Sequence, residues 1–389
     1  MPTVSKARRK QADAAAAAFD AHFRKEYGDR WDTLHEYLRR PTAYAALINA
    51  YAPAAEADSV LMADPASSNY ALFKLPALES PGPTRLLSLV CPRLPPGRDL
   101  PFPPARPAAA SDPALRLHTH WNLDAASILV AHMLDARPGH AVLDLCSAPG
   151  GKAICIAQRL WPELYADRPG PKPVQPSMLH VNEVDQSRNV RLASNMKNFL
   201  PQSLFDKGLV EVLQLDGSSS RAVNLFPLGE EGYDRVLLDA PCSSERHIIH
   251  AHTRASNSGT IAPEMSAWKP QSSKSIAKLQ LSLLRTAWSA LRVGGKMIYA
   301  TCSLSSTEND QVVAAFLEGN DSAVVHWGVP GPAEDVQLAA ACERTKFGRI
   351  ALPDHPIPGT EQRSPWGPLY FCMLHKVTTT AGASGSGNH

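Results

Sequence analysis

The sequence predicts an α/β fold in which a mostly parallel sheet carries helices on both faces. Beyond residue 113, short apolar runs typical of strands alternate with longer stretches whose apolar residues recur every three to four positions. This alternation is the pattern of βαβ units. Glycines or polar side chains follow these strands directly. The 389-residue chain is also long enough for one large domain with an added N-terminal region.

The N-terminal region is expected to be helical. Residues 12–51 carry apolar side chains at helical spacing. The basic, alanine-rich stretch before Phe19 has two interpretations, an organelle transit peptide or a solvated tail leading into a helix. Prolines gather in residues 92–113, which excludes a regular helix or central strand and predicts a linker. We therefore place a helical N-terminal region with its linker over residues 1–113.

The α/β domain is expected over residues 114–376, and a disordered low-complexity tail over 377–389. A first helix is predicted over residues 121–140, ending near its proline. Buried strands are predicted at AVLDLC, MLHVNEV, VEVLQL, RVLLDA and KMIYAT. The helices between them are predicted at KAICIAQRL, QSRNVRLASNMKNFL and SIAKLQLSLLRTAWSAL. A proline-rich loop, YADRPGPKPVQPS, precedes the second strand.

Composition limits the classes of function. Charged residues make up 20% of the chain and the formal net charge is +2, which permits RNA binding without the strongly basic footprint of many nucleic-acid-binding proteins. No run approaches the ~18 apolar residues of a membrane span, so no membrane partner is expected. The seven cysteines are odd in number and form no CxxC pair, which favours free thiols and predicts no metal site.

The first candidate motif follows the strand that ends at Asp144. It consists of Cys146, Ser147, Ala148, Pro149, Gly150, Gly151 and Lys152. Paired glycines let the backbone approach a ligand closely, while a helix N-terminus and a lysine attract a carboxylate. The methionine carboxylate of S-adenosylmethionine (SAM) would suit this turn; the alternative is a plain strand-to-helix turn. The pattern is neither GxGxxG nor GxxxxGK[ST], which disfavours NAD and ATP.

Two further strand ends carry candidate cofactor ligands. Glu183 is expected to bind the ribose hydroxyls, as carboxylates do in dinucleotide folds. Asp185 is the rival, although it also suits a helix N-cap. Arg188 either stiffens this site or is solvated. Asp216, with Gly217, could accept from the adenine amino group or serve as a turn residue.

Two cysteines follow the next two strands. Asp239-Ala240-Pro241-Cys242 ends one strand, and Thr301-Cys302 ends the other. Because the carboxyl ends of parallel strands meet at one edge, we expect the two thiols to be neighbours. The side chains of Cys146 and Cys155 are expected to serve in packing instead.

Four segments, LDLCSAPGGK, NEVDQSR, LDAPCSS and ATCSLSSTEND, together resemble the Nop/Sun (RsmB/NOP-type) RNA cytosine-5 methyltransferase family. The match runs in order over roughly residues 115–376. The resemblance implies a Rossmann-like class I SAM-dependent methyltransferase with SAM as cofactor and RNA as substrate. The segments SSERH, FPPARP and GPLYFCMLHKV resemble the branch that methylates mitochondrial ribosomal RNA, which has tRNA-modifying relatives.

The resemblance also implies the roles of three side chains. Cys302 would attack carbon 6 of cytosine, which makes carbon 5 nucleophilic, and Cys242 would assist release. Asp239 would hydrogen-bond the cytosine edge near N3 or contact SAM, or do both. Spacing alone is symmetric between the cysteines. DNA cytosine methyltransferases instead use the PC cysteine together with an ENV motif, which is absent from this sequence.

The sequence says less about which RNA is bound than about the chemistry of the reaction. A loop after Cys242 is expected to touch RNA or to lie free on the surface, and it carries Arg246, His247, His250, His252 and Arg254. Because the net charge is only +2, phosphate contacts should be few, and we expect a partner protein that supplies RNA binding. The target cytosine must be unpaired or flippable. The alternatives are a tRNA, DNA or small-molecule methyltransferase, or a non-catalytic ribosome-assembly factor.

Overall fold

The computed structural model describes residues 6–42, 44–65, 67–73, 86–89, 102–109, 116–326, 338–357, 359, 361, 363–364 and 366–378. Cys91, most of the expected proline-rich linker and nearly all of the expected tail lie outside the described residues.

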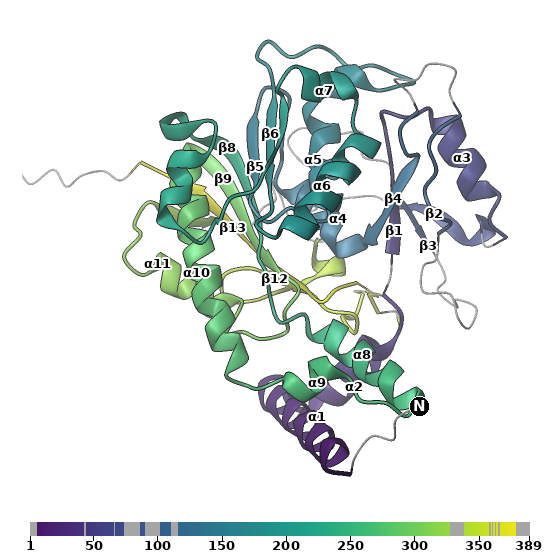
Figure 1. Ribbon diagram of the computed structural model, residues 1–389, viewed down its shortest axis with the longest axis vertical. Coiled ribbons are helices and arrows are strands. Elements are labelled where there is room, and N and C mark those ends of the chain that lie inside the picture. The colour runs from purple at the N-terminus through teal and green to yellow at the C-terminus, as the bar shows by residue number, and fades with distance from the viewer. Residues whose placement is uncertain are drawn as a thin grey trace, which may run out of the picture.

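A large sheet forms the centre of the molecule (Figure 1). Its described strands follow the order β11-β12-β13-β9-β8-β5-β6-β7, and β10 pairs with β13. The parallel strands are β5 (Ala141–Asp144), β6 (Met178–Asn182), β7 (Val210–Leu213), β8 (Tyr233–Asp239) and β9 (Leu291–Thr301). The antiparallel strands are β10 (Ala323–His326), β11 (Glu343–Arg344), β12 (Arg349–Ala351) and β13 (Leu369–Lys376). The expected α/β fold is confirmed.

The strand order reverses between β5 and β8. The chain moves outward from β5 through β6 to β7 and then returns to β8 on the other side of β5. Ligands of such sheets bind beyond the carboxyl ends of the strands at this reversal. Because Asp144 ends β5 and Asp239 ends β8, the topology brings the glycine turn and one cysteine motif to adjoining strand ends.

Helices cover both faces of the sheet. They are α4 (Ala125–Met133), α5 (Gly151–Leu160), α6 (Gln186–Phe199), α7 (Gln202–Asp206), α10 (Ser272–Ala290) and α11 (Asp310–Leu317). Two further helices, α8 (Glu245–Asn257) and α9 (Pro263–Ala267), lie away from the sheet beside the N-terminal helices. Alternate side chains of each strand enter different cores, as the period of two requires. Leu237 packs in the cluster with α4 and α5, whereas its neighbours Val236 and Leu238 pack in the cluster with α10 and α11.

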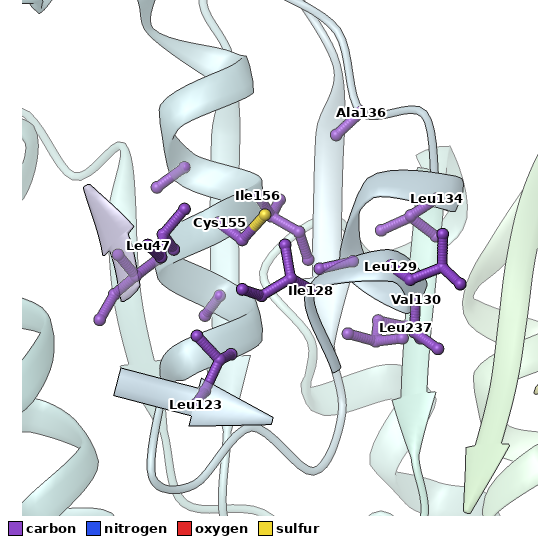
Figure 2. Packing of buried hydrophobic residues seen from close by; sticks show 14 of the residues in the cluster. Leu47, Leu123, Ile128, Leu129, Val130, Leu134, Ala136, Cys155, Ile156 and Leu237 are labelled. Carbon is purple, nitrogen blue, oxygen red and sulfur yellow. The ribbon is translucent and has the colours of Figure 1, made fainter. Parts of the chain in front are cut away.

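Figure 2 shows the first of these cores, in which Ile128 of α4 lies beside Ile156 of α5, and Leu237 of β8 belongs to the same cluster. Cys155 lies among them, and burial raises the pKa of its thiol to about 12. Cys155 is therefore a packing residue, as expected.

The N-terminal region contains α1 (Lys6–Tyr27), α2 (Trp31–Arg39) and α3 (Ala54–Met62). The helix expected over residues 12–51 is wrong at its end, because TAYAALI contains strand β1 (Tyr44–Ile48). This strand pairs with β3 (Leu86–Leu89) and β4 (His120–Asp124), and β2 (Tyr70–Phe73) completes a four-stranded sheet. Pairing on both edges and burial of Ala45 to Ile48 override the helical preference of alanine and leucine.

The helix expected over residues 121–140 is shorter than predicted at both ends. Residues up to Asp124 belong to β4, which is paired with β1. The Asp124 carboxylate accepts a hydrogen bond from Ala126 N at 2.9 Å and so caps α4 at its start. The helix ends at Met133, just before Asp135 adopts a left-handed φ of 51°.

Aromatic side chains attach α1 and α2 to the domain beside α8 and α9 (Figure 1). The Phe23 and Trp31 rings stack with centroids 5.3 Å apart, and Phe19 meets Trp268 edge-on at 5.0 Å. From Ala12 onward the basic, alanine-rich stretch therefore forms a packed helix. Among the described helices, none is long and apolar enough to cross a membrane.

Candidate active site

Cys242 and Cys302 meet at the carboxyl edge of the sheet. Cys242 lies three residues beyond the end of β8, and Cys302 immediately follows β9. Their Sγ atoms are 3.0 Å apart, so the expected proximity of the two thiols is confirmed. Both side chains are partly exposed, whereas Cys155 and Cys372 are buried.

The two thiols are electrostatically unequal. The hydrogen bond from Cys242 lowers the pKa of Cys302, and the Ser244 hydroxyl and Lys152 ammonium act in the same direction, against burial and the Asp239 charge. The same hydrogen bond to Cys302, together with burial, raises the pKa of Cys242. These directions favour the thiolate form at Cys302, whose sulfur also lies nearer to the Ser244 hydroxyl than that of Cys242.

Ser244 is a member of this site that the sequence did not indicate. Its Oγ lies 3.1 Å from Sγ of Cys302 and 3.5 Å from Sγ of Cys242. Its φ of 53° is in the left-handed region, which is strained for a residue with a Cβ and often marks functional sites. No signal in the sequence distinguishes this serine from Ser243 beside it.

Lys152 joins the glycine turn to the cysteine motifs. Its ammonium donates to Asp239 Oδ2 at 2.6 Å and to Ser127 Oγ at 3.0 Å. Burial disfavours the ammonium, but the charge and hydrogen bond of Asp239 raise the pKa of Lys152. We expected the Lys152 ammonium to attract the SAM carboxylate. In the structure it instead binds Asp239 at the end of the neighbouring strand β8 and holds that side chain in place.

The turn between β5 and α5 is the candidate for the methionine end of SAM. The first N–H groups of α5 have no acceptor within the helix, and Gly150 has a left-handed φ of 113°. A Cβ on Gly151 would lie 2.6 Å from Nε1 of Trp121, so only glycine fits there. Asp144 is wholly buried behind the turn, and burial raises its pKa to about 7 against the opposing effect of Ser147.

Glu183 and Asp185, the two candidate ribose ligands after β6, make different contacts. Asp185 caps α6, since its Oδ1 accepts from Arg188 N at 2.8 Å and from Ser187 Oγ at 2.7 Å. Glu183 is buried and faces Arg188, with its Oε2 3.2 Å from the guanidinium. Arg188 also donates to Ala148 O at 3.1 Å, so it links the ribose candidate to the glycine turn.

Asp216 and Gly217 lie in the loop after β7. Asp216 Oδ1 accepts from Ser218 N at 3.0 Å and from Ser218 Oγ at 2.6 Å, which is a turn-forming arrangement. Among the described residues, no donor bonds Asp216 Oδ2, so this exposed carboxylate keeps acceptor capacity. Gly217 packs closely on Leu145, whose Cδ1 would be 3.0 Å from an added Cβ.

The predicted loop of histidines and arginines after Cys242 is wrong, because these residues form helix α8. The Arg246 guanidinium is buried and donates to carbonyl oxygens of Arg40, Pro41 and Gly367. The His250 ring bonds Leu38 O at 2.8 Å. These side chains tie α2 to the catalytic edge and are not free for RNA, while His247 and Arg254 stay exposed. Within the described ranges, no group of three or more His, Cys, Asp or Glu is arranged to hold a metal.

Comparisons with solved structures agree with this fold. NSun6 from Pyrococcus horikoshii with SFG aligns with a TM-score of 0.58 and 15% identity, over 93% of this chain and 98% of that chain. A methyltransferase homolog protein from Pyrococcus horikoshii aligns with a TM-score of 0.55 and 18% identity, over 96% and 100%.

Sequence comparisons give relatives of similar length. The tRNA (cytosine(34)-C(5))-methyltransferase, mitochondrial, of Mus musculus is 29% identical over 370 residues, which is 93% of this chain and 90% of that protein. The 5-cytosine rRNA methyltransferase NSUN4 of Bos taurus is 28% identical over 381 residues, covering 92% and 88%. Residues 131–336, more than half of the chain, match the family model described as 16S rRNA methyltransferase RsmB/F. The chain therefore belongs to the RsmB/F family, the Nop/Sun RNA methyltransferases.

Proposed function

We propose that this protein transfers a methyl group from SAM to carbon 5 of cytosine in RNA through a covalent bond between Cys302 and the base. The observation that carries the proposal is the 3.0 Å approach of the Cys242 and Cys302 sulfurs, beside the Lys152–Asp239 pair. Such a pair suits a reaction that needs one thiol to attack and another to assist release.

The attack begins at Cys302, which is the more acidic thiol of the pair. Its sulfur adds to carbon 6, and the electrons of the C5–C6 double bond move toward carbon 5 and the N3 edge. Asp239, held by Lys152, would bond that edge and stabilise the developing charge. Carbon 5 is then the nucleophile.

SAM supplies an electrophilic methyl group when bound. We propose that the turn from Cys146 to Lys152 holds its methionine end, that Glu183 with Arg188 holds the ribose, and that Asp216 with Gly217 lines the adenine. Asp239 lies where these residues meet the cysteine pair and could contact both substrates.

Release requires removal of the proton on carbon 5. The electrons of that C–H bond re-form the C5–C6 double bond, the C6–S bond breaks, and the Cys302 thiolate is regenerated. While Cys302 is free, its hydrogen bond raises the pKa of Cys242. Once Cys302 is alkylated this effect is lost, so Cys242 can ionise and act as the base.

The test is an adduct assay with SAM and cellular RNA from a strain that lacks the gene. Cys242→Ala should leave a protein–RNA adduct that survives denaturing gel electrophoresis. Cys302→Ala should form neither adduct nor methylated product. An adduct that depends on Cys242 instead would contradict the assigned roles.

We further propose mitochondrial ribosomal RNA as the target and the mitochondrion as the location. Support comes from the similarity to NSUN4 of Bos taurus and from the SSERH segment after Cys242. The mitochondrial tRNA methyltransferase of Mus musculus is equally similar, so a tRNA is the second candidate. Bisulfite sequencing of mitochondrial rRNA and tRNA after gene deletion distinguishes them, because only the true target loses a protected cytosine.

We also propose the division of the chain into an N-terminal region over residues 1–113, a methyltransferase domain over 114–376 and a tail over 377–389. The last strand of the sheet ends at Lys376, which supports the second boundary. A protein partner that supplies RNA binding is proposed from the net charge of only +2. Tight, specific RNA binding by the lone chain would count against that partner.

A further inference from the structure

We propose that Glu245 and Glu308 form a crossed clamp that holds the two cysteine loops in register. Each glutamate follows one cysteine along the chain and binds the loop of the other. Both would be positioning residues that act through the cysteines, and the proposal rests on the proposed function of those cysteines.

Glu245 connects the Cys242 loop to the Cys302 loop. It is the first residue of α8, three positions after Cys242. Its Oε1 accepts from Ser303 Oγ at 3.1 Å, and its Oε2 accepts from Leu304 N at 2.9 Å. Both donors belong to the two residues that directly follow Cys302. Glu245 therefore fixes the backbone next to Cys302.

Glu308 makes the reciprocal connection. It follows Cys302 by six positions, and its Oε2 accepts from Ser243 N at 3.0 Å while its Oε1 accepts from Ser243 Oγ. Gln280 of α10 supports this contact, because its Nε2 donates to Glu308 Oε2 at 3.2 Å and to Pro241 O at 2.9 Å. Ser243 is therefore held by a residue of the Cys302 loop, and Pro241 by the glutamine that supports it.

Burial makes these contacts strong constraints. The relative exposure of Glu245, Glu308, Gln280 and Ser303 is 0% for each. A buried carboxyl is costly unless its oxygens are bonded, and here every one of the four carboxyl oxygens is. A movement of either loop would break its bonds to the buried glutamate that holds it.

The clamp matters because the site needs two different geometries from one pair of sulfurs. Cys302 must lie near Ser244 and Cys242 to ionise, and Cys242 must lie near carbon 5 to assist release. A displacement of about 1 Å costs an enzyme on the order of 100-fold in rate. Glu308, which holds the Cys242 loop, should govern release, and Glu245, which holds the Cys302 loop, should govern attack.

The experiment measures the two steps separately in the full-length protein, with SAM and cellular RNA from a strain that lacks the gene. Single-turnover methyl transfer reports attack, and decay of the denaturation-resistant adduct reports release.

Glu308→Gln and Ser243→Ala should slow release on the order of 10–100-fold and accumulate adduct. Glu245→Gln and Ser303→Ala should slow attack by a similar factor without accumulation. If a glutamate variant does not fold, the variant of its serine partner removes the same contact and still tests the clamp.

Matched controls exclude a general loss of structure. Ser177→Ala removes a wholly buried hydroxyl that donates to Leu160 O, remote from the cysteines. Glu343→Gln removes a carboxylate paired with Arg30. Both should keep attack and release near wild-type rates per folded molecule. Equal slowing of the two steps in all four clamp variants, or slowing in neither, would overturn the clamp.

The wild-type enzyme and Cys242→Ala are run in the same assay, so failure of the clamp is distinguishable from failure of the proposed function. If Cys242→Ala accumulates adduct but Glu308→Gln and Ser243→Ala do not, the clamp alone is refuted. If Cys242→Ala also forms no adduct, the roles proposed for the cysteines are refuted first.

Discussion

The two halves of the site are built differently. Around the glycine turn and the end of β6, Asp185, Arg188 and Asp216 are exposed. Around the cysteines, the supporting polar residues Glu245, Gln280, Ser303 and Glu308 have no exposure. The cofactor half combines one buried carboxylate, that of Glu183, with exposed side chains that a ligand can reach. In the cysteine half, the carboxyl oxygens of Glu245 and Glu308 are all bonded internally before any substrate arrives.

Cofactor binding and the covalent chemistry therefore depend on differently built parts of the same sheet edge. An exposed carboxylate exchanges bonds with water and tolerates change, whereas a buried one loses most of its stabilisation when a partner is removed. Substitutions in the cysteine half should therefore act mainly on kcat, and those in the cofactor half mainly on the KM for SAM.

The largest effect is expected for Cys302→Ala. Without the attacking thiol, no covalent step exists, and methylation should fall by roughly 10³-fold or more. The measurement is transfer of labelled methyl groups to RNA. Retention of SAM binding in the same variant is the control, since Cys302 lies outside the proposed cofactor contacts.

The next effect concerns Lys152, which reaches from one half of the site to the other. Lys152→Met keeps the stem but removes the charge that fixes Asp239. We expect kcat to fall on the order of 10²-fold with a smaller change in the KM for SAM. A change confined to the KM for SAM would show that Lys152 serves the cofactor after all.

A smaller effect is expected for Glu183→Gln. A charged hydrogen-bond acceptor is worth ~1.5–3 kcal/mol, so the KM for SAM should rise about tenfold or more while kcat changes little. Asp185→Asn is the matched control, because that carboxylate caps α6 and should cost stability of ~1 kcal/mol or less. The reverse pattern would assign the ribose to Asp185.

The pH dependence of attack provides a finer test. The pKa of Cys302 is lowered by Cys242, with Ser244 assisting, so attack should persist at pH values below the usual thiol range. It should decline only as the pH falls through that lowered pKa. Ser244→Ala removes one stabilising hydrogen bond, and the acid limb of single-turnover methyl transfer should move to higher pH. No movement would mean that the hydroxyl does not serve the thiolate.

The smallest effect is on stability. Burial raises the pKa of Glu245 to about 8, above the ordinary value of the unfolded chain. A raised pKa contributes stability that is fully present below the unfolded value and is lost as the pH rises through about 8. Glu245→Gln should remove this decline between acidic and alkaline pH. Chemical denaturation at several pH values measures it, and identical pH profiles would contradict the assignment.

The sequence predicted the parts of the molecule that are local in the chain. The strand and helix order, the glycine turn and the proximity of the cysteines all follow from periodicity and from the rule that parallel strands end at one edge. The sequence did not predict β1, because its alanine-rich pattern suits a helix until β3 and β4 pair with it. It likewise did not predict α8, whose histidines and arginines suggested a surface loop.

The clamp was beyond sequence reasoning for a different reason. Glu245 and Glu308 bind residues 59 and 65 positions away, and nothing in a single sequence marks a buried carboxylate with a distant partner. Lys152 shows the same limit. Its place in the turn was evident, but its direction toward Asp239 depends on the reversal between β5 and β8.

The proposed covalent mechanism is tested most directly by finding which cysteine sulfur becomes bonded to the cytosine base. RNA that carries 5-fluorocytidine at the target position traps the adduct, because carbon 5 then has no proton to remove. Proteolysis and mass spectrometry of the trapped wild-type complex would locate the linked peptide. We expect the nucleotide on the peptide that contains Cys302, and attachment to the peptide that contains Cys242 would contradict the proposed roles of the two cysteines.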